Sequence, residues 1–307
     1  SFGLESVFVS KWHYVKPFSQ TKKQFGGAIL SINQKIVFLS LNLLKKYIMK
    51  RLLSIELQKI WLNKASRVLT LTYFILLSFI ALIASIKFDL GVFKFHLAEM
   101  GIFNFPFIWH FNTYIAAILK FFLAIVIVSM MANEYSYGTL KQNLIDGMSK
   151  KELVLSKFLT VVAFALASTV FVFVMSLILG LCFSSYTEVS IIFSDLEYVL
   201  AFFVKLTGFF SLCLFLGILV KRSAFAIGFL LVLSIAEGIA KGVLTFKIFP
   251  DSPIAGYITQ FFPLEAMSNL IVEPFSRLSL VKTIGSQIGV ENTKDYGVAF
   301  TTILIVL

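Results

Sequence analysis

One polar loop decides how this chain is interpreted, and it reads Asn133-Glu-Tyr-Ser-Tyr-Gly-Thr-Leu-Lys-Gln-Asn-Leu-Ile-Asp-Gly-Met-Ser-Lys-Lys-Glu-Leu-Val-Leu-Ser-Lys157. The loop separates two of the most apolar segments of the chain, and two glycines interrupt it. In a chain this apolar, a polar loop with so much local structure is typical of a contact with a soluble partner. The role of this loop depends on which segments flank it and on which side of the membrane it faces.

The composition is that of an integral membrane protein. The 307 residues are 58% hydrophobic and 14% charged, with a mean hydropathy of +0.91. Soluble domains carry about 25% charged residues. This deficit of charge, together with 35 phenylalanines, excludes an ordinary globular protein.

The net charge of +11 is basic, but it does not indicate a nucleic-acid-binding protein. In membrane proteins Lys and Arg accumulate in cytoplasmic loops. No basic cluster is interleaved with stacking aromatic residues in the manner of a nucleic-acid interface, so we expect no nucleic acid among the partners. Cys182 and Cys213 both lie in apolar segments, where they are interpreted as small buried hydrophobic residues.

A membrane-spanning helix needs about 20 mostly apolar residues. Five segments meet this requirement, namely residues 68–86, 114–132, 158–183, 198–220 and 224–244. The final apolar stretch, residues 298–307, covers only about 15 Å at about 1.5 Å per residue, half of a hydrocarbon core of about 30 Å. We therefore expect an all-α integral membrane protein, a polytopic helical bundle with five complete spans and a truncated sixth.

The orientation of the spans follows from the basic residues. They concentrate before the first span, in loop 134–157 and in the turn after the fourth span: Lys45, Lys46, Lys50, Arg51, Lys59, Lys64, Arg67, Lys141, Lys150, Lys151, Lys157, Lys221 and Arg222. The alternate loops are poorer, with Lys87 and Lys94 in one and none in residues 184–197. The positive-inside rule then places the N-terminus and loop 134–157 in the cytoplasm of a multi-pass protein of the inner (plasma) membrane.

The N-terminal region divides into two parts. Residues 1–48 contain no initiator Met, no clear span and no signal-peptide cleavage pattern. We expect them to be translated upstream sequence, a non-native or flexible extension; the alternative is a true cytoplasmic extension whose residues 36–44 touch the membrane. The transmembrane domain then comprises residues 49–307.

Residues 49–64 are predicted to form an amphipathic helix in the cytoplasmic interface, before the first span. The apolar residues recur at helical spacing and the charged residues take the other face. The apolar set is Leu53, Leu57, Ile60 and Trp61, and the charged set is Lys50, Arg51, Glu56, Lys59 and Lys64.

Loop 134–157 is predicted to contain two helical pieces. The first piece covers residues 140–145, where Leu140, Leu144 and Ile145 are able to share a face. Gly147 then ends it as a left-handed cap. Ser149 as N-cap and Glu152 at N3 fit a capping box that opens the third span. Such a rigid corner suits docking of a neighbouring protein; the alternative is a solvated connector that only terminates helices.

At these residues the sequence resembles the permease (transmembrane) subunits of type-2 ABC (ABC-2) exporters. The resemblance rests on a Glu-x-x-x-Gly-Thr-apolar sequence, then a Gly or Pro, a Ser followed by a basic residue, and a Lys that opens the third helix. These positions are Glu134, Gly138, Thr139, Leu140, Gly147, Ser149, Lys150 and Lys157. The 49–64 helix resembles the family's elbow helix, and the segment after the fifth span lies where the family has a re-entrant hairpin. The sequence departs from the family pattern in two places. Gly147-Met148 stands where many members have Pro, and the sixth span is unfinished.

The resemblance implies that residues 139–146 are a coupling helix seated in a separate ABC ATPase subunit. It also implies a second permease copy, identical or similar, within the lipid bilayer. The chain contains no Gly-x-x-x-x-Gly-Lys-[Ser/Thr] phosphate loop. We therefore expect a permease subunit that is not an enzyme and binds no cofactor itself, with ATP and Mg on the partner ATPase.

Four charged residues fall inside the expected spans: Lys120, Lys205, Glu237 and Lys241. A charge at the bilayer centre costs about 2.5–3.5 kcal/mol on insertion scales. By helical rise, the first three share a layer about 10 Å below the outer surface. Our hypothesis is that Glu237 pairs with Lys120 or Lys205. The alternative is that both lysines extend toward the surface independently and that Glu237 pairs with Lys241 at i, i+4.

Two other functional classes remain open at the level of sequence. The first is a secondary, ion-coupled transporter that uses the layer of Lys120, Lys205 and Glu237. The second is a non-transporting membrane scaffold or immunity-type protein, for which loop 134–157 would be dispensable. His96 and His110 lack metal-ligand spacing with any Cys or carboxylate, so no metal site is expected.

Overall fold

The computed structural model describes residues 49–85, 88–90, 93–95, 101–186, 188–250, 252–277, 297–298 and 300–307. The chain forms two compact units, Ser1–Ser54 and Ile55–Leu307. In the first unit the described residues, 49–54, are helical. The expectations about residues 1–48, Ile86 and His96 lie outside the described residues.

In its described residues, the regular structure of the second unit is helical apart from one short hairpin. Its first half contains a helical segment at residues 55–62, α2 (Lys64–Ser85), the antiparallel strands β1 (Phe88–Leu90) and β2 (Phe93–Phe95), α3 (Phe107–Leu119), α4 (Phe121–Ser136), α5 (Thr139–Ile145) and α6 (Lys150–Phe183). Its second half contains α7 (Val189–Ile192), α8 (Glu197–Val220), α9 (Ser223–Val243), η1 (Leu244–Ile248), α10 (Ile254–Thr259), α11 (Pro263–Asn269), η2 (Phe275–Arg277) and α13 (Phe300–Val306).

Four stretches within the described residues are long and apolar enough to cross a membrane: Lys64–Ala84, Lys150–Phe183, Val189–Val220 and Ser223–Ile248. A fifth candidate is the pair α3 and α4, which pass the same test together but are bent by 43°. The expected multi-pass helical fold is therefore confirmed, and the hairpin is a small addition to it. The expected single span over residues 114–132 is corrected to this bent pair, which begins at Phe107 and breaks at Lys120.

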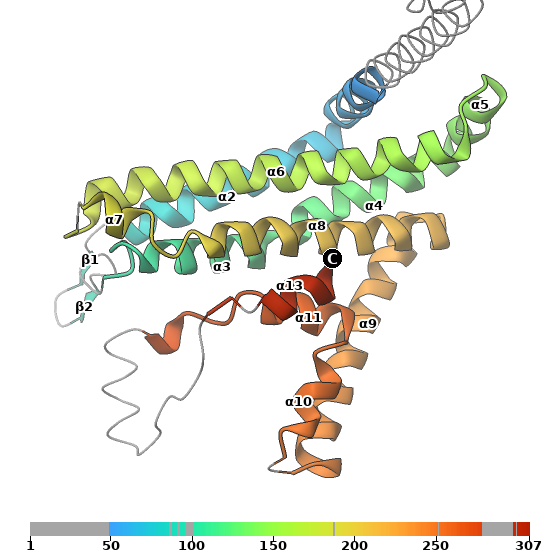
Figure 1. Cartoon of the computed structure of the whole chain (residues 1–307). Coiled ribbons are helices and arrows are strands. Elements are labelled where there is room, and N and C mark those ends of the chain that lie inside the picture. Colours follow the sequence, from blue (N-terminus) through green and yellow to red (C-terminus); the bar gives the residue numbers. More distant parts are fainter. Residues whose placement is uncertain are drawn as a thin grey trace, which may run out of the picture. The chain divides into compact units, whose positions relative to one another are not determined.

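The candidate spans pack around α8. In Figure 1, α2, α6, α8 and the α3–α4 pair run alongside one another, and α8 contacts α3, α4, α6 and α9. Three phenylalanines of α8, Phe202, Phe209 and Phe210, are fully buried. By contrast, α9 buries only Ala226 and Leu230 in this chain. Its remaining apolar surface is that of a helix facing lipid or another membrane protein.

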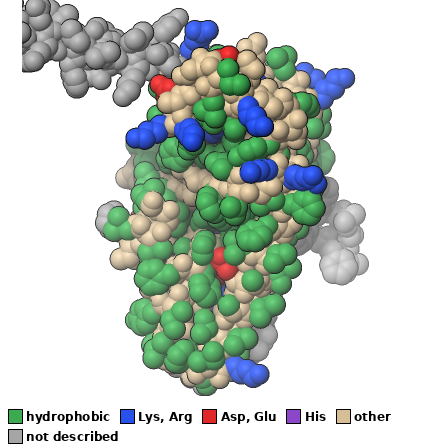
Figure 2. All heavy atoms as spheres, turned by 90° about the vertical axis from the view of Figure 1, so that its right-hand side faces the viewer, with side chains coloured by type: hydrophobic (Ala, Val, Ile, Leu, Met, Phe, Trp, Pro, Cys, Tyr) green, Lys and Arg blue, Asp and Glu red, His purple; other side chains and the backbone are tan. Residues whose placement is uncertain are grey.

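One end of the bundle gathers the basic residues. There Lys221 at the end of α8 lies over the ring of Tyr135 in α4, and the Tyr135 hydroxyl donates to the carbonyl of Ile218 at 3.3 Å. We call this the basic end; its exposed cations are Lys141, Lys150, Lys151, Lys221 and Arg222. Figure 2, which looks toward that side of the molecule, shows Lys and Arg side chains gathered above a largely hydrophobic surface. The positive-inside rule predicts that this end is cytoplasmic.

The chain returns to the bundle after α9. Helix α11 contacts both α8 and α9, and α13 packs against α8 and α11. Gly208 of α8 makes this approach possible, because a Cβ there would lie 2.7 Å from the side chain of Val306. The stretch expected to begin a sixth span, residues 298–307, thus contains the seven-residue helix α13 within the described residues.

Candidate functional site

Helix α5 lies between two glycines that adopt left-handed backbone conformations. Gly138 precedes it with φ +69°, and Gly147 follows it with φ +97°. A Cβ at either position would meet nothing within 4 Å, so the backbone conformation and not the available space favours glycine here. The amide of Met148 donates to the carbonyl of Asn143 and that of Gly147 to Leu144, which is a Schellman cap. The left-handed cap predicted at Gly147 is confirmed.

Helix α5 is exposed on the basic end of the bundle. It contains no buried residue, and Ile145 is 78% exposed. In Figure 1 it stands at the end of α4 and α6, beyond the other helices of the bundle. Leu140 is partly buried and packs against the core, so the face expected to hold Leu140, Leu144 and Ile145 together is divided. Among the apolar side chains of α5, that of Ile145 is the most exposed and therefore the most accessible to a partner.

The capping box predicted at the start of the third span is present. The Glu152 amide donates to Ser149 Oγ at 3.2 Å, and the Ser149 amide donates to Glu152 Oε2 at 3.0 Å. Because this cap starts α6 at Lys150, the helix has 34 residues, more than the expected 158–183. At about 1.5 Å per residue it is about 50 Å long, against a hydrocarbon core of about 30 Å. Helix α6 is therefore longer than a membrane core, and its polar first turns are the part that we expect to extend beyond the membrane, together with α5.

Four charged side chains meet behind α5, and we call them the charge cluster: Glu56, Lys59, Glu134 and Lys157. Lys157 Nζ donates to Glu134 Oε1 at 2.8 Å and also to a carboxylate oxygen of Glu56. Lys59 Nζ donates to Glu134 Oε1 at 2.9 Å and to Glu56 Oε1 at 3.3 Å. Two cations and two anions thus balance, which is the condition for burying them.

Burial in the charge cluster is uneven. The side chains of Lys157, Glu134 and Glu56 are 1%, 4% and 8% exposed, whereas that of Lys59 is 43% exposed. Partial burial lowers the pKa of Lys59, but the hydrogen bond to Glu134 and the charges of both glutamates outweigh it. The net pKa of Lys59 is therefore raised above 10.5, so Lys59 is protonated at neutral pH.

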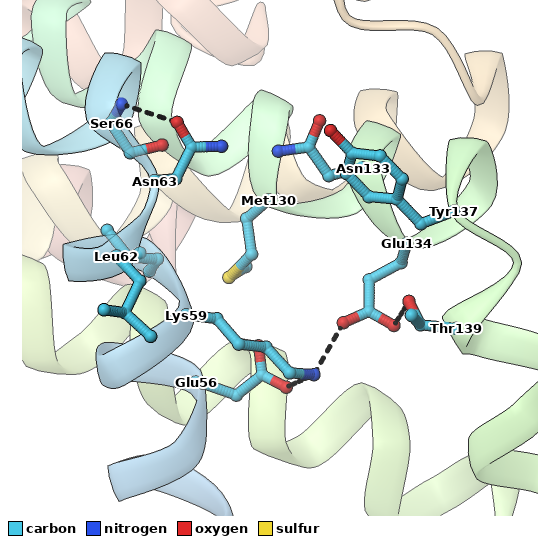
Figure 3. A pocket seen from close by; sticks show the side chains of 11 residues that line it. Glu56, Lys59, Leu62, Asn63, Ser66, Met130, Asn133, Glu134, Tyr137 and Thr139 are labelled. Carbon is cyan, nitrogen blue, oxygen red and sulfur yellow. Dashed lines mark hydrogen bonds and ion pairs between the residues drawn. The ribbon is translucent and has the colours of Figure 1, made fainter.

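The charge cluster connects α5 to three other segments. Thr139, the first residue of α5, donates from Oγ1 to Glu134 Oε2 at 2.9 Å. Glu134 lies in the last turn of α4, Lys157 lies near the start of α6, and Glu56 and Lys59 come from the helical segment 55–62. Figure 3 shows Glu134 between Lys59 and Thr139. A displacement of α5 therefore acts directly on Glu134, and through it on segment 55–62 and on the start of α6.

The sequence motif contained Glu134 and Lys157, but Glu56 and Lys59 were missed as members of the site. Both were expected on the polar face of the interfacial helix, yet Glu56 is 6% exposed and faces the bundle. One signal was available: Glu56 is the only acidic residue among residues 49–67. A single carboxylate in such a basic segment could have been predicted to form an ion pair with a buried lysine.

A cavity of about 360 Å³ lies beside the charge cluster, between segment 55–63, α2 and α4. Its lining combines charged, amide and apolar side chains: Glu56, Lys59, Ile60, Leu62, Asn63, Ser66, Met130, Asn133, Glu134, Tyr137 and Thr139. Figure 3 shows the amides of Asn63 and Asn133 turned toward each other across the cavity, with Met130 between them. The cavity leaves space between segment 55–63 and α4 that no side chain fills.

The intramembrane carboxylate Glu237 does not pair with a lysine within the described residues. Its Oε2 accepts hydrogen bonds from the amides of Leu264 at 3.0 Å and Glu265 at 3.1 Å, in the first turn of α11. Amides at a helix start have no partner within the helix, so the carboxylate satisfies them. Lys241 pairs instead with Glu265. Both sequence hypotheses, Glu237 with Lys120 or Lys205 and Glu237 with Lys241, were therefore wrong.

The two intramembrane lysines lie elsewhere. Lys120 Nζ lies 4.2 Å from the ring centroid of Phe209. Lys205 is 4% exposed, and its Nζ is 3.5 Å from the carbonyl oxygen of Ser268 in α11. They face the interior and not the membrane surface, which corrects the expectation that they extend outward.

His110 serves a structural contact. Its Nε2 lies 2.7 Å from the carbonyl oxygen of Val272, and its Nδ1 lies 3.1 Å from a guanidinium nitrogen of Arg277. The ring stacks on Tyr198 with centroids 4.3 Å apart. These contacts fix the chain after α11 against α3 and α8.

Comparison with known proteins identifies one family. The family described as "Protein of unknown function (DUF2705)" matches residues 74–264, which is more than half of the chain. The match includes α5, Glu134 and Lys157, and all four intramembrane charges. No curated protein and no solved structure matches the chain. With several candidate membrane spans and a match of this extent, the chain is a multi-span helical membrane protein that belongs to the DUF2705 family.

Proposed function

We propose that this chain is the permease subunit of an ATP-driven ABC-2 exporter, and that α5 is its coupling helix. The observation that carries the proposal is α5 itself, a short, exposed helix held between two left-handed glycines at the basic end of a membrane bundle. The resemblance of residues 134–157 to the coupling loop of ABC-2 permeases supports the same assignment. An ABC ATPase subunit would bind α5, and a second permease copy would complete the assembly.

The local structure suits the transmission of force. A flexible loop would absorb the movement of a partner, whereas α5 ends in a Schellman cap and is followed directly by a continuous 34-residue helix. The charge cluster links the same corner to segment 55–62 and α4. Closure of an ATPase dimer would push α5, and the connected helices would then move between inward-open and outward-open arrangements.

The division of labour follows from the sequence. This chain contains no phosphate-loop motif, so ATP and Mg would bind to the partner subunit and the chain itself would not be an enzyme. The permease would supply the pathway through the inner membrane, with its N-terminus and α5 in the cytoplasm.

Co-purification tests the proposal most directly. The full chain would be expressed in its native host with an affinity tag, extracted in mild detergent and analysed by mass spectrometry for a bound nucleotide-binding subunit. We expect this subunit with the wild-type chain and its loss with the double variant Leu144→Asp/Ile145→Asp, because two charges replace the apolar contact surface of α5. The matched control is Val189→Asp, which is 69% exposed in α7, at the end of the bundle opposite α5.

Two outcomes would contradict the proposal. Retention of the ATPase subunit by the α5 variant would show that α5 is dispensable, as a membrane scaffold or immunity-type protein predicts. Transport that depends on a proton or sodium gradient without any ATPase partner would indicate a secondary transporter. That second class has lost its main support, because Glu237 binds α11 instead of joining Lys120 and Lys205 in one layer.

A further inference from the structure

Two lysines of the bundle, the buried Lys205 and the partly buried Lys120, have no anionic partner in the part of the chain that the structure describes. Lys205 Nζ has a single long contact, 3.5 Å to the carbonyl oxygen of Ser268. Lys120 Nζ contacts only aromatic rings, those of Phe209 at 4.2 Å and Phe121 at 6.0 Å from the centroids. The ion pairs among the described residues all involve other lysines.

The two lysines gather on one face of α8. Phe209 follows Lys205 by four residues in the same helix, so the two side chains are neighbours on the helix surface. Lys120, at the break between α3 and α4, lies over the ring of Phe209. The bend of 43° at Lys120 thus occurs where its ammonium group meets α8. We call Lys120 and Lys205 the lysine pair.

An uncompensated pair of cations in the membrane interior is unfavourable and is expected to recruit negative charge. The carboxylate at similar depth, Glu237, is already engaged by two amides of α11. The aromatic rings beside Lys120 offer a weaker cation–π contact that does not neutralise charge. A bound anion would supply the counter-charge that the described residues do not, and it would stabilise the protonated form of both lysines.

We propose that the lysine pair is a binding site for a phosphate or carboxylate group. The surroundings suit an anion attached to an apolar body, because Phe121, Phe209 and Cys213 line the same region of α4 and α8. If the chain is a permease, its cargo carries such an anionic group; this second statement rests on the proposed function. Ammonium groups bind phosphate and carboxylate through short, charge-assisted hydrogen bonds, stronger than those between neutral groups.

Helix α11 lies against Lys205 of the lysine pair in this structure. Its Ser268 carbonyl lies against Lys205, while Glu237 and Lys241 of α9 hold its first turn. An anion that reaches Lys205 replaces the weak carbonyl contact. Release of α11 from α9 would widen the access.

The experiment measures ligand-induced thermal stabilisation of the full chain in neutral detergent, without any partner subunit. Three additives are compared: phosphatidylglycerol, phosphatidylcholine and inorganic phosphate. The test variant is Lys120→Met/Lys205→Met, and the matched control is Lys247→Met, which removes an exposed cation from η1. A second variant, Lys205→Arg, keeps the charge.

We expect an anionic additive to raise the unfolding midpoint of the wild-type chain, the Lys247→Met control and the Lys205→Arg variant. In the double methionine variant the concentration needed for half of the effect should rise roughly tenfold or more, since charge-assisted bonds are lost. Without additive this variant should unfold at a temperature at least as high as the wild-type chain, because apolar side chains replace uncompensated cations.

The additives distinguish the sources of the anion. A response to phosphatidylglycerol alone assigns an amphiphile headgroup, and a response to inorganic phosphate assigns a small anion; both support the site. No response to either anion, an equal response in the double methionine variant, or an equal response to phosphatidylcholine would overturn it. Because no ATPase takes part in this experiment, a negative result would overturn the anion site without contradicting the proposed function, which the co-purification experiment tests separately.

Discussion

Two groups of charged side chains in one bundle differ in whether their charges are balanced. The charge cluster behind α5 contains two lysines and two glutamates within direct hydrogen-bonding distance. The lysine pair beside α8 contains two cations and no carboxylate within the described residues. The first group is complete within the chain and holds segments together, whereas the second is incomplete and suits a ligand. Whether the charges of a group balance within the chain therefore distinguishes a structural contact, such as the charge cluster, from a candidate binding site, such as the lysine pair.

The largest expected effect comes from breaking the charge cluster. Glu134→Gln leaves the buried Lys157 and the partly exposed Lys59 facing a single carboxylate, and we expect a loss of about 3–5 kcal/mol in the free energy of unfolding. Reversible unfolding in mixed detergent micelles measures it. The double variant Glu134→Met/Lys157→Met removes one charge of each sign and should recover most of the loss. If the double variant were as unstable as the single one, the cluster would not be held by charge balance.

A second prediction concerns the contact that replaced the expected ion pair. Glu237→Ala removes the acceptor for two amides of α11 and should cost about 2 kcal/mol of unfolding free energy. Adding Lys205→Met should produce an effect that is additive within about 0.5 kcal/mol, because the two residues share no contact. A double-mutant cycle measures this coupling. Strong rescue by Lys205→Met would restore the sequence hypothesis that Glu237 and Lys205 form a pair.

The features that the sequence predicted are those with local causes. Apolar length identified the candidate spans, Gly147 identified the end of α5, and the Ser149–Glu152 spacing identified the start of α6. The features that it missed depend on contacts between distant segments. Glu56 meets Lys157 across 101 residues, and Lys59 meets Glu134 across 75.

The intramembrane charges show the same limit. Helical rise gives the depth of a residue along its span, but not the direction in which its side chain points. Glu237, Lys120 and Lys205 were assigned to one layer by depth, yet Glu237 faces α11 and the lysines gather at α8. The rotation of each helix about its axis is set by tertiary packing, which the pattern of a single sequence does not show.

A third prediction tests the rigidity of α5. Gly147→Ala places a side chain in the left-handed region and should cost about 1 kcal/mol of unfolding free energy. The same variant should weaken co-purification of an ATPase subunit, because the Schellman cap that orients α5 is lost. The control is Gly228→Ala in α9, where a Cβ meets nothing and the glycine is helical. There we expect a gain of about 0.5–1 kcal/mol; equal losses at both positions would argue against a special conformation at Gly147.

The smallest expected effect lies within the charge cluster itself and shows why burial sets its strength. Lys59 and Lys157 both bind Glu134 at similar distances, 2.9 and 2.8 Å, but their side chains are 43% and 1% exposed. Lys59→Met should therefore cost less than about 1 kcal/mol and become neutral at high salt, because water and ions screen an exposed pair. Lys157→Met should cost several times more and respond little to salt. Equal losses in parallel unfolding titrations at low and high salt would mean that exposure does not distinguish the two lysines, and the contrast between a closed charge cluster and an open lysine pair would lose its physical basis.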